Sequence, residues 1–251
     1  MPSPPRTPWN IVSLRPAGRH GALRAAARRH GGGLIALSSC RIEPVCDVTA
    51  QASLEAALGA AVVIFTSPEA VRAARARVSG STIDSAVAVG SGTAAALRRL
   101  GIRGVISPAR MDSEGLLDLP ILQTVAGHAV GLVTAPGGRG RLQPALEARG
   151  ARVVRADIYR RVPHAPSPRA VAALLEATAP GVVAVSSAEA LQHVLQVLPA
   201  PAGERLRGMA AVAASKRLAE TARAAGFEHI RVANGPRPAQ LVAAVRTHPA
   251  R

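Results

Sequence analysis

The chain has 251 residues, which is enough for one large domain or two of ordinary size. Hydrophobic residues make up 48% of it, which excludes a disordered chain, and aromatic residues only 2%, so the core must consist of Ala, Val, Leu and Ile. The formal net charge of +16 favours an anionic ligand or partner. No apolar run approaches the roughly 18–20 residues of a membrane span, and the Pro-rich start lacks the apolar core of a signal peptide, so we expect a cytoplasmic protein.

Short apolar runs alternate with amphipathic helical patterns along the whole chain. Continuous apolar runs are typical of strands buried on both faces of a parallel sheet, and their alternation with helices predicts an α/β protein with doubly wound parallel sheets. Gly31, Gly101, Gly150 and Gly226 end four of the helical patterns, as expected of the residue that accepts left-handed backbone. The expected strands are 11–14, 62–65, 86–89, 130–133, 182–185 and 210–213, and the expected helices are 21–31, 68–78, 91–101, 140–150, 188–198 and 215–226.

The chain also repeats itself once. NIVSLRPAGRHGAL from Asn10 recurs as VGLVTAPGGRGRL from Val130, and IFTSPEAV recurs as AVSSAEAL, with the same shift of 120 residues (130 − 10 and 184 − 64). AVAVGSGTAAALRRLG recurs as AAVAASKRLAETARAAGF, with its Gly shifted by 125 residues (226 − 101). Three phrases in the same order indicate two related halves, since the repeats of a solenoid are far shorter.

Five loops that follow the expected strands are rich in Ser, Thr and Gly: TSPE, GSGT, APGGRG, SSAE and ASKR. In parallel sheets, ligands bind at the carboxyl ends of the strands, where exposed N–H groups at helix N-termini attract anions. Any one of these hydroxyls can equally be a helix cap with no ligand. Their occurrence in two matching sets favours an anion-binding role.

Signatures of several other chemistries are absent from the sequence. There is no GxGxxG after the first strand, no GxxxxGK[ST], no GxSxG and no HExxH, and Cys40 and Cys46 form no CxxC pair. The seven histidines are scattered. We therefore expect neither a metal nor a cofactor. Nucleic acid is a disfavoured partner because few aromatic side chains are available to stack on bases.

Four stretches resemble motifs of the uroporphyrinogen-III synthase family. IFTSPEAV resembles its strand-to-helix motif, VGSGTAAAL its VGxxTAxxL motif, SLRPAG its N-terminal strand end, and GGRGRLQPALEARGARVVRADIYRRVP its Gly-Arg loop, helix and Tyr-bearing strand. The resemblance spans roughly residues 10 to 246. The chain departs from the family at Gly140, where Glu is frequent, and at Ser215 and Lys216, where the second VGxxT-like motif has Gly and Thr.

The resemblance implies two flavodoxin-like domains joined by a two-stranded linker. Residues 1–40 together with 163–251 would form one discontinuous α/β domain, and residues 47–156 the inserted domain. The segments 40–47 and 156–163 would be the linker strands. The two related phrases of the repeat would then belong to different domains.

The resemblance also implies a function. The chain would be a lyase that cyclises hydroxymethylbilane, with inversion of ring D and loss of water, to uroporphyrinogen III in heme biosynthesis. It would need no cofactor, act as a monomer and make transient contact with the preceding pathway enzyme. Tyr159, the only tyrosine, matches the family's tyrosine implicated in departure of the hydroxyl group, although a packing role is its alternative. The residues expected to hold substrate carboxylates are Arg15, Thr66, Ser67, Gly90, Ser91, Thr93, Arg139, Ser186, Ser187, Ser215 and Lys216.

The sequence leaves a second function open, because VAASKRL departs from the family motif and the net charge is strongly positive. The chain could keep the bilobed fold as a non-catalytic regulatory protein that binds anions or nucleic acid. Steep salt dependence of DNA binding without any effect on tetrapyrroles would favour this alternative.

Overall fold

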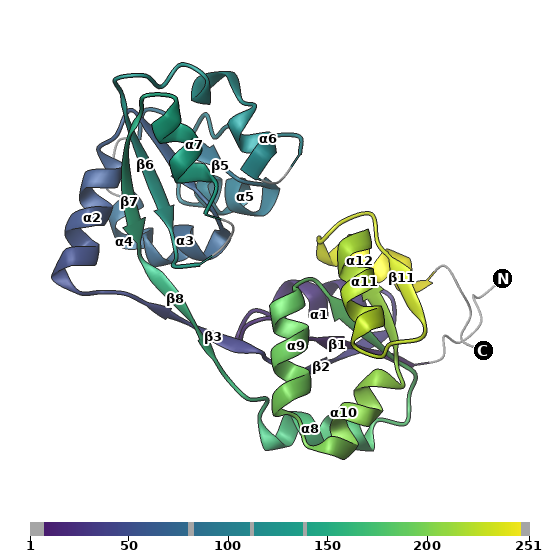
Figure 1. Ribbon diagram of the computed structural model, residues 1–251. Helices are drawn as coiled ribbons and strands as arrows, with labels where there is room; N and C mark the ends of the chain where they lie inside the picture. Colours follow the sequence, from purple (N-terminus) through teal and green to yellow (C-terminus); the bar gives the residue numbers. More distant parts are fainter. Residues whose placement is uncertain (1–7, 80–82, 111–112, 138–139, 247–251) are drawn as a thin grey trace. The chain divides into compact units, whose positions relative to one another are not determined.

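The structure is a computed structural model that describes residues 8–79, 83–110, 113–137 and 140–246. The chain forms two compact units (Figure 1). Unit 1 consists of Met1–Arg41 and Arg161–Arg251, and unit 2 of Ile42–Arg160. The expected fold class, α/β with doubly wound parallel sheets, is confirmed in both units.

Unit 1 contains a five-stranded parallel sheet with the order β11-β10-β9-β1-β2. Its strands are β1 (Trp9–Ser13), β2 (Gly32–Ala36), β9 (Gly181–Val185), β10 (Ala210–Ala213) and β11 (Ile230–Val232). The chain winds from β1 to β2 in one direction and from β9 to β11 in the other, which is the flavodoxin-like order. The winding direction therefore reverses between β1 and β9, where Ser13 pairs with Ala184.

Helices cover both faces of this sheet, and their buried residues form one aliphatic core around β1, β9 and β10. α1 packs against α12, α8 against α10, and α9 against α11. Right-handed crossovers place the first pair on one face and the other helices on the opposite face. Their bounds are α1 Gly21–Arg28, α8 Pro168–Glu176, α9 Ala188–Val197, α10 Ala200–Arg207, α11 Lys216–Ala224 and α12 Pro238–Arg246.

Unit 2 contains a four-stranded parallel sheet with the order β5-β4-β6-β7. Its strands are β4 (Val62–Phe65), β5 (Ala86–Ala88), β6 (Ala129–Thr134) and β7 (Arg152–Asp157). Here the winding direction reverses between β4 and β6, where Phe65 pairs with Val133. By the general rule for open α/β sheets, such a reversal opens a crevice at the carboxyl ends of the two strands.

The helices of unit 2 bury two separate hydrophobic clusters, one on each face of the sheet. α2 (Val48–Leu58), α3 (Pro68–Ala73), α4 (Arg75–Val78) and α5 (Ser91–Arg99) contribute to the cluster that contains Phe65. α6 (Ser113–Leu117), the 3₁₀ helix η1 (Pro120–Leu122) and α7 (Leu142–Ala148) contribute to the cluster that contains Ile64. Alternate residues of β4 therefore point to opposite faces, as strand geometry requires.

Two expectations about the helices have clear outcomes. The single helix expected over 68–78 is wrong, because the backbone turns at Ala74 (ψ −3°) and divides it into α3 and α4, which lets Ala74 and Val78 both reach the core. The four expected helix-ending glycines are confirmed, with φ of 74°, 87°, 81° and 93° in chain order. None of the helices in the described ranges is long and apolar enough to cross a membrane.

A two-stranded ribbon carries the chain out of unit 1 and back. It consists of β3 (Cys40–Pro44) and β8 (Tyr159–Pro163). The ribbon is antiparallel, because the Val45 N–H donates to the Ile158 carbonyl at one end and the His164 N–H donates to the Ser39 carbonyl at the other.

Candidate functional site

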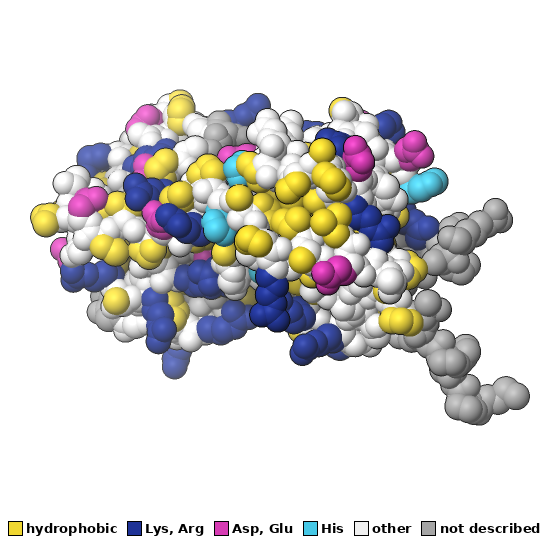
Figure 2. All heavy atoms as spheres, turned by 90° about the horizontal axis from the view of Figure 1, so that it is seen from below, with side chains coloured by type: hydrophobic (Ala, Val, Ile, Leu, Met, Phe, Trp, Pro, Cys, Tyr) yellow, Lys and Arg dark blue, Asp and Glu magenta, His cyan; other side chains and the backbone are white. Residues whose placement is uncertain are grey.

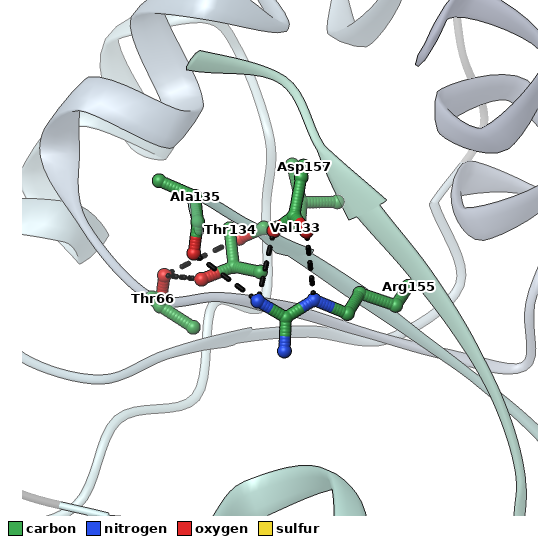
Figure 3. Close-up of polar contacts among 6 residues, drawn as sticks. All are labelled: Thr66, Val133, Thr134, Ala135, Arg155 and Asp157. Atoms are coloured by element: carbon green, nitrogen blue, oxygen red, sulfur yellow. Dashed lines mark hydrogen bonds and ion pairs between the residues drawn. The ribbon is translucent and has the colours of Figure 1, made fainter. Parts of the chain in front are cut away.

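Two threonine hydroxyls are hydrogen-bonded to each other at the switch point of unit 2, where the winding direction reverses between β4 and β6. Thr66 follows β4 directly and Thr134 is the last residue of β6. The Thr66 Oγ1 hydroxyl donates to Thr134 Oγ1 at 2.8 Å and lies 3.5 Å from the Val133 carbonyl oxygen (Figure 3). Both side chains are half-buried. Thr66 was predicted from the sequence, whereas Thr134 was not.

Ser67 and Tyr159 meet beside this pair. Ser67 Oγ lies 2.9 Å from the Tyr159 hydroxyl, across 92 residues of sequence. Ser67 also caps α3, because its Oγ accepts a hydrogen bond from the Ala70 N–H at 3.0 Å. The ring of Tyr159 is only 2% exposed and belongs to the core of unit 2. The structure therefore combines the packing role of Tyr159 with a specific contact of its hydroxyl.

An arginine and an aspartate that the sequence reasoning missed lie at the same edge. On β7, Arg155 Nε and Nη2 donate to Asp157 Oδ2 and Oδ1, both at 3.0 Å. Arg155 Nη2 also donates to the Ala135 carbonyl at 3.2 Å (Figure 3). Residues 152–157 were not among the expected strands, and the spacing of two residues was the available signal, because alternate residues of a strand share one face.

The loop after β5 lies beside the loop after β4. The Val89 N–H donates to the Phe65 carbonyl at 3.2 Å, and a Cβ at Gly92 would stand 3.6 Å from Pro68 Cγ. Of the predicted residues here, Gly90 is the buried N-cap of α5, Ser91 is half-buried, and Thr93 is 2% exposed. The Thr93 side chain therefore faces the core in this structure, and Ser91 is the most accessible of the three predicted residues.

The Gly-Arg loop after β6 is described only at its two ends. Arg139, predicted to bind substrate, lies outside the described residues. Gly137 and Gly140, on either side, have positive φ of 86° and 61°, which side chains with a Cβ rarely adopt. Arg141 Nη1 lies 2.8 Å from Glu114 Oε1, which ties the start of α7 to α6.

In unit 1, Arg15 lies just past β1, beside the switch point of that sheet. Its Nη2 donates to the Pro236 carbonyl at 3.3 Å. Its Nε is buried and has no hydrogen-bond partner among the described residues. Burial lowers the pKa of the Arg15 guanidinium from its usual value. A desolvated guanidinium with an unused donor favours an anion as its partner.

His20, which the sequence reasoning did not single out, is buried close to Arg15. Its Nδ1 lies 2.9 Å from Ser13 Oγ and its Nε2 lies 3.0 Å from Ser38 Oγ. Burial lowers the pKa of His20, and the charges of Arg24 and Arg15 lower it further. A neutral imidazole offers one donor and one acceptor, so it can satisfy both serines at once. No motif around His20, which immediately precedes α1, indicated that its side chain would bond to both serines.

The other predicted residues of unit 1 lie at two adjacent helix N-termini. Ser187 caps α9 by accepting from the Ala190 N–H at 3.2 Å, and Ser215 caps α11 by accepting from the Leu218 N–H at 3.3 Å. The Ala214 N–H donates to the Val185 carbonyl, which holds the two loops together. Ser186 and Lys216 are exposed. Capping is thus an observed role of both Ser187 and Ser215.

Basic side chains outnumber acidic ones on the face that Figure 2 draws. Figure 2 shows Lys and Arg side chains at many places on the face it draws, interspersed with hydrophobic side chains and with fewer acidic ones. Across the described part of the chain, no three His, Cys, Asp or Glu side chains gather in a way that could hold a metal ion. The candidate sites therefore consist of hydroxyls, helix N-termini and guanidinium groups.

A family model described as uroporphyrinogen-III synthase HemD matches residues 21–243. Uroporphyrinogen-III synthase of Escherichia coli (strain K12) is 34% identical over 149 residues, which are 59% of this chain and 61% of that protein. Uroporphyrinogen-III synthase of Salmonella typhimurium is 33% identical over the same length and with the same shares. The alignments thus span about three fifths of the length of these relatives.

Two solved structures illustrate the related fold. A mutant uroporphyrinogen III synthase from Thermus thermophilus aligns with a TM-score of 0.57 and 20% identity, covering 94% of this chain and 97% of that one. Uroporphyrinogen-III synthetase from Helicobacter pylori aligns with a TM-score of 0.59 and 15% identity, covering 94% and 99%. At these identities the likeness establishes the fold.

Proposed function

The chain belongs to the uroporphyrinogen-III synthase family, and we propose that it catalyses the cyclisation of hydroxymethylbilane to uroporphyrinogen III. Water leaves from the hydroxymethyl carbon of ring A, and ring D attacks the resulting azafulvene at its substituted carbon. Ring D is then inverted and the macrocycle closes. Because the pyrroles supply the electrons, the protein has to hold the linear chain, restrain ring D and protonate the departing hydroxide.

The observation that carries this proposal is the contact between Ser67 Oγ and the Tyr159 hydroxyl, 2.9 Å apart at the carboxyl edge of unit 2. A phenol hydroxyl can donate a hydrogen bond and a proton. The ring of Tyr159 is fixed by burial, so its hydroxyl is held in one place and needs little reorganisation. Tyr159 is therefore the proposed general acid for loss of water.

Ser67 has a defined part in this proposal. Its Oγ already accepts the Ala70 N–H, and it is half-buried while Tyr159 is almost completely buried. Either hydroxyl can be the donor in the Tyr159–Ser67 contact. Ser67 thus either orients the phenol or passes its proton to the leaving hydroxide.

Substrate carboxylates have two kinds of partner in the proposal. Arg15 in unit 1 offers a charged donor, its Nε, that has no hydrogen-bond partner in the described structure. Helix N-termini and nearby hydroxyls offer neutral donors in both units. The remaining residues proposed for this role are Thr66, Ser67, Gly90, Ser91, Thr93, Arg139, Ser186, Ser187, Ser215 and Lys216, of which Thr93 is the weakest candidate because of its burial.

The test is an isomer assay with enzymatically generated hydroxymethylbilane. We expect the purified protein to give predominantly isomer III, whereas the spontaneous reaction gives isomer I. A product no richer in isomer III than the protein-free control would overturn the proposal. Loss of the excess of isomer III in Tyr159→Phe, in a protein that remains folded, would assign the reaction to this site.

Three further properties belong to the same proposal. We infer that the protein acts as a monomer in the cytoplasm and makes transient contact with the enzyme that supplies hydroxymethylbilane. Light scattering over a range of protein concentrations tests the first property, and a dimer with an unchanged mass on dilution would contradict it. The contact is tested by comparing two assays, one in which the preceding enzyme supplies hydroxymethylbilane and one in which free hydroxymethylbilane is added. We expect isomer III to form faster in the first.

A further inference from the structure

The segment after β6 begins where the sheet's hydrogen bonding ends. The last ladder bond between β6 and β7 runs from the Ile158 N–H to the Thr134 carbonyl at 3.1 Å. The next carbonyl belongs to Ala135, which is only 5% exposed and accepts from Arg155 Nη2 at 3.2 Å. A buried carbonyl needs a donor, and Arg155 supplies it from outside the ladder.

Arg155 is itself held in one orientation. Two of its nitrogens bind the two carboxylate oxygens of Asp157, both at 3.0 Å, in the planar fork arrangement that fixes direction as well as distance. In the sheet register, Leu132 pairs with Arg155 and Thr134 pairs with Asp157, so all four lie on the face that α6 and α7 cover. The guanidinium thus links the end of β7 to the residue that follows β6.

A second arginine makes an ion pair at the other described end of the same segment, between side chains that are 65% and 33% exposed. Arg141 Nη1 lies 2.8 Å from Glu114 Oε1 at the start of α7. Gly137 and Gly140, on either side of the residues that are not described, have positive φ, a conformation that residues with a Cβ rarely adopt. An arginine contact is thus present at each described end of the segment, and the one made by Arg155 is to the backbone.

From these contacts we propose that Arg155, braced by Asp157, is a positioning residue for the ligand-facing edge of unit 2. By holding Ala135 it fixes the neighbouring Thr134, whose hydroxyl accepts from Thr66, the residue next to Ser67. The expected consequence is tighter binding of the substrate rather than a faster chemical step. This inference rests on the proposed function.

Two other roles for Arg155 are less consistent with its contacts. Arg155 is poorly suited to binding a substrate carboxylate, because Asp157 already neutralises its charge through two hydrogen bonds. As a source of stability it is weak, because the Arg155 and Asp157 side chains are 31% and 35% exposed, and ion pairs with such exposure contribute little. The geometric role, which uses all three contacts, is the one that remains.

The experiment compares Arg155→Met, Arg155→Lys and Asp157→Asn in the full chain by KM, kcat, isomer ratio and melting temperature. Arg152→Met is the matched control, because Arg152 is an exposed arginine at the opposite end of the same strand. We expect Arg155→Met to raise KM about tenfold with a much smaller change in kcat, since small displacements of a binding group are costly. Its melting temperature should stay close to that of the control.

The other two variants separate the alternatives. Arg155→Lys keeps the charge but lacks the planar fork that fixes the direction of the guanidinium, so it should not restore KM. Asp157→Asn should raise KM if Arg155 is a positioning residue, and should lower KM if Arg155 binds a substrate carboxylate. An unchanged KM in Arg155→Met, a lowered KM in Asp157→Asn, or a loss shared by Arg152→Met would overturn the inference.

The proposed function is judged separately, by whether the wild-type protein forms isomer III in the same assay. Amide hydrogen exchange gives a readout that needs no activity. Faster exchange in peptides that contain Ala135, in Arg155→Met but not in Arg152→Met, is expected. Unaltered exchange there would contradict the positioning role even if the wild-type protein proved to be a synthase.

Discussion

The carboxyl edges of the two sheets are built differently. At the switch point of unit 2, the polar groups satisfy one another: Thr66 donates to Thr134, and Arg155 is paired with Asp157. At the switch point of unit 1, Arg15 keeps a buried Nε without a hydrogen-bond partner in the described structure. The two flavodoxin-like units thus differ, because one has organised hydroxyls and the other has a guanidinium with an unused donor.

This contrast suggests a division of labour. An organised hydroxyl pair suits proton donation at a fixed point, because its geometry is set before the ligand arrives. A guanidinium with a buried, unused donor is suited to binding a carboxylate. The free-energy cost of removing that donor from water is already present in the free protein, and the carboxylate supplies the missing hydrogen bond. We therefore expect variants of the unit 2 hydroxyl pair, Ser67 and Tyr159, to change turnover and variants of Arg15 in unit 1 to change substrate affinity.

The largest effect is expected for Tyr159→Phe. Removing the phenol removes the proposed acid, and general acid help is worth about 10²–10⁴-fold. Since water or Ser67 can partly substitute, we expect turnover to fall about 10²-fold while the protein stays folded. Trp9→Phe is the control, because Trp9 lies in unit 1 with its Nε1 bonded to the His30 carbonyl. Wild-type turnover and isomer ratio in Tyr159→Phe would show that the residue only packs.

A matched pair of helix caps tests whether Ser67 does more than cap. Ser67 and Ser167 both precede a proline, and each accepts from the N–H three residues further on. Both Ser→Ala variants should lose about 1 kcal/mol of unfolding free energy, measured with urea. Only Ser67→Ala should lower turnover, by about tenfold, because it alone contacts Tyr159. Equal turnover in the two variants would reduce Ser67 to a cap.

Arg15→Met tests the unit 1 side of the contrast. Losing the charged donor should raise KM by about tenfold, the typical value of one hydrogen bond to a charged group, with little change in kcat. Arg28→Met, at an exposed position in the last turn of α1, is the control for net charge. Steady-state kinetics at low and high salt provide the measurement. A fall in kcat with unchanged KM would contradict the assigned division of labour.

The smallest effect concerns His20 and pH. Its pKa is lowered in the folded protein, so below about pH 6.5 the unfolded chain binds a proton that the folded protein does not. Stability should therefore fall as the pH falls through this value, until the folded His20 is protonated as well. His20→Asn should lose that part of the dependence, measured by urea unfolding at several pH values. An identical pH dependence in the variant would show that other groups dominate.

Much of the fold and part of the site were predictable from the sequence, because they depend on local patterns. Apolar runs placed the core strands, and glycine placed four helix ends at positive φ. The Ser-Pro of the TSPE loop was predictable as a capped helix start, and Ser67 has that role. The break at Ala74 was not predictable, because the residues on both sides are good helix formers and only packing against the sheet favours the turn.

Only the tertiary structure decided which residues far apart in the chain contact one another. The sequence alone determined that hydroxyls and arginines would follow the strands, because the residues that favour turns and helix caps act on their immediate neighbours in the chain. The order β5-β4-β6-β7 brought Thr66 next to Thr134. Packing of the elements around this sheet brought Ser67 next to Tyr159 and buried Thr93 instead of exposing it. Strand order is a property of the packed sheet, which balances the burial of all its helices at once, and no single stretch of sequence encodes it.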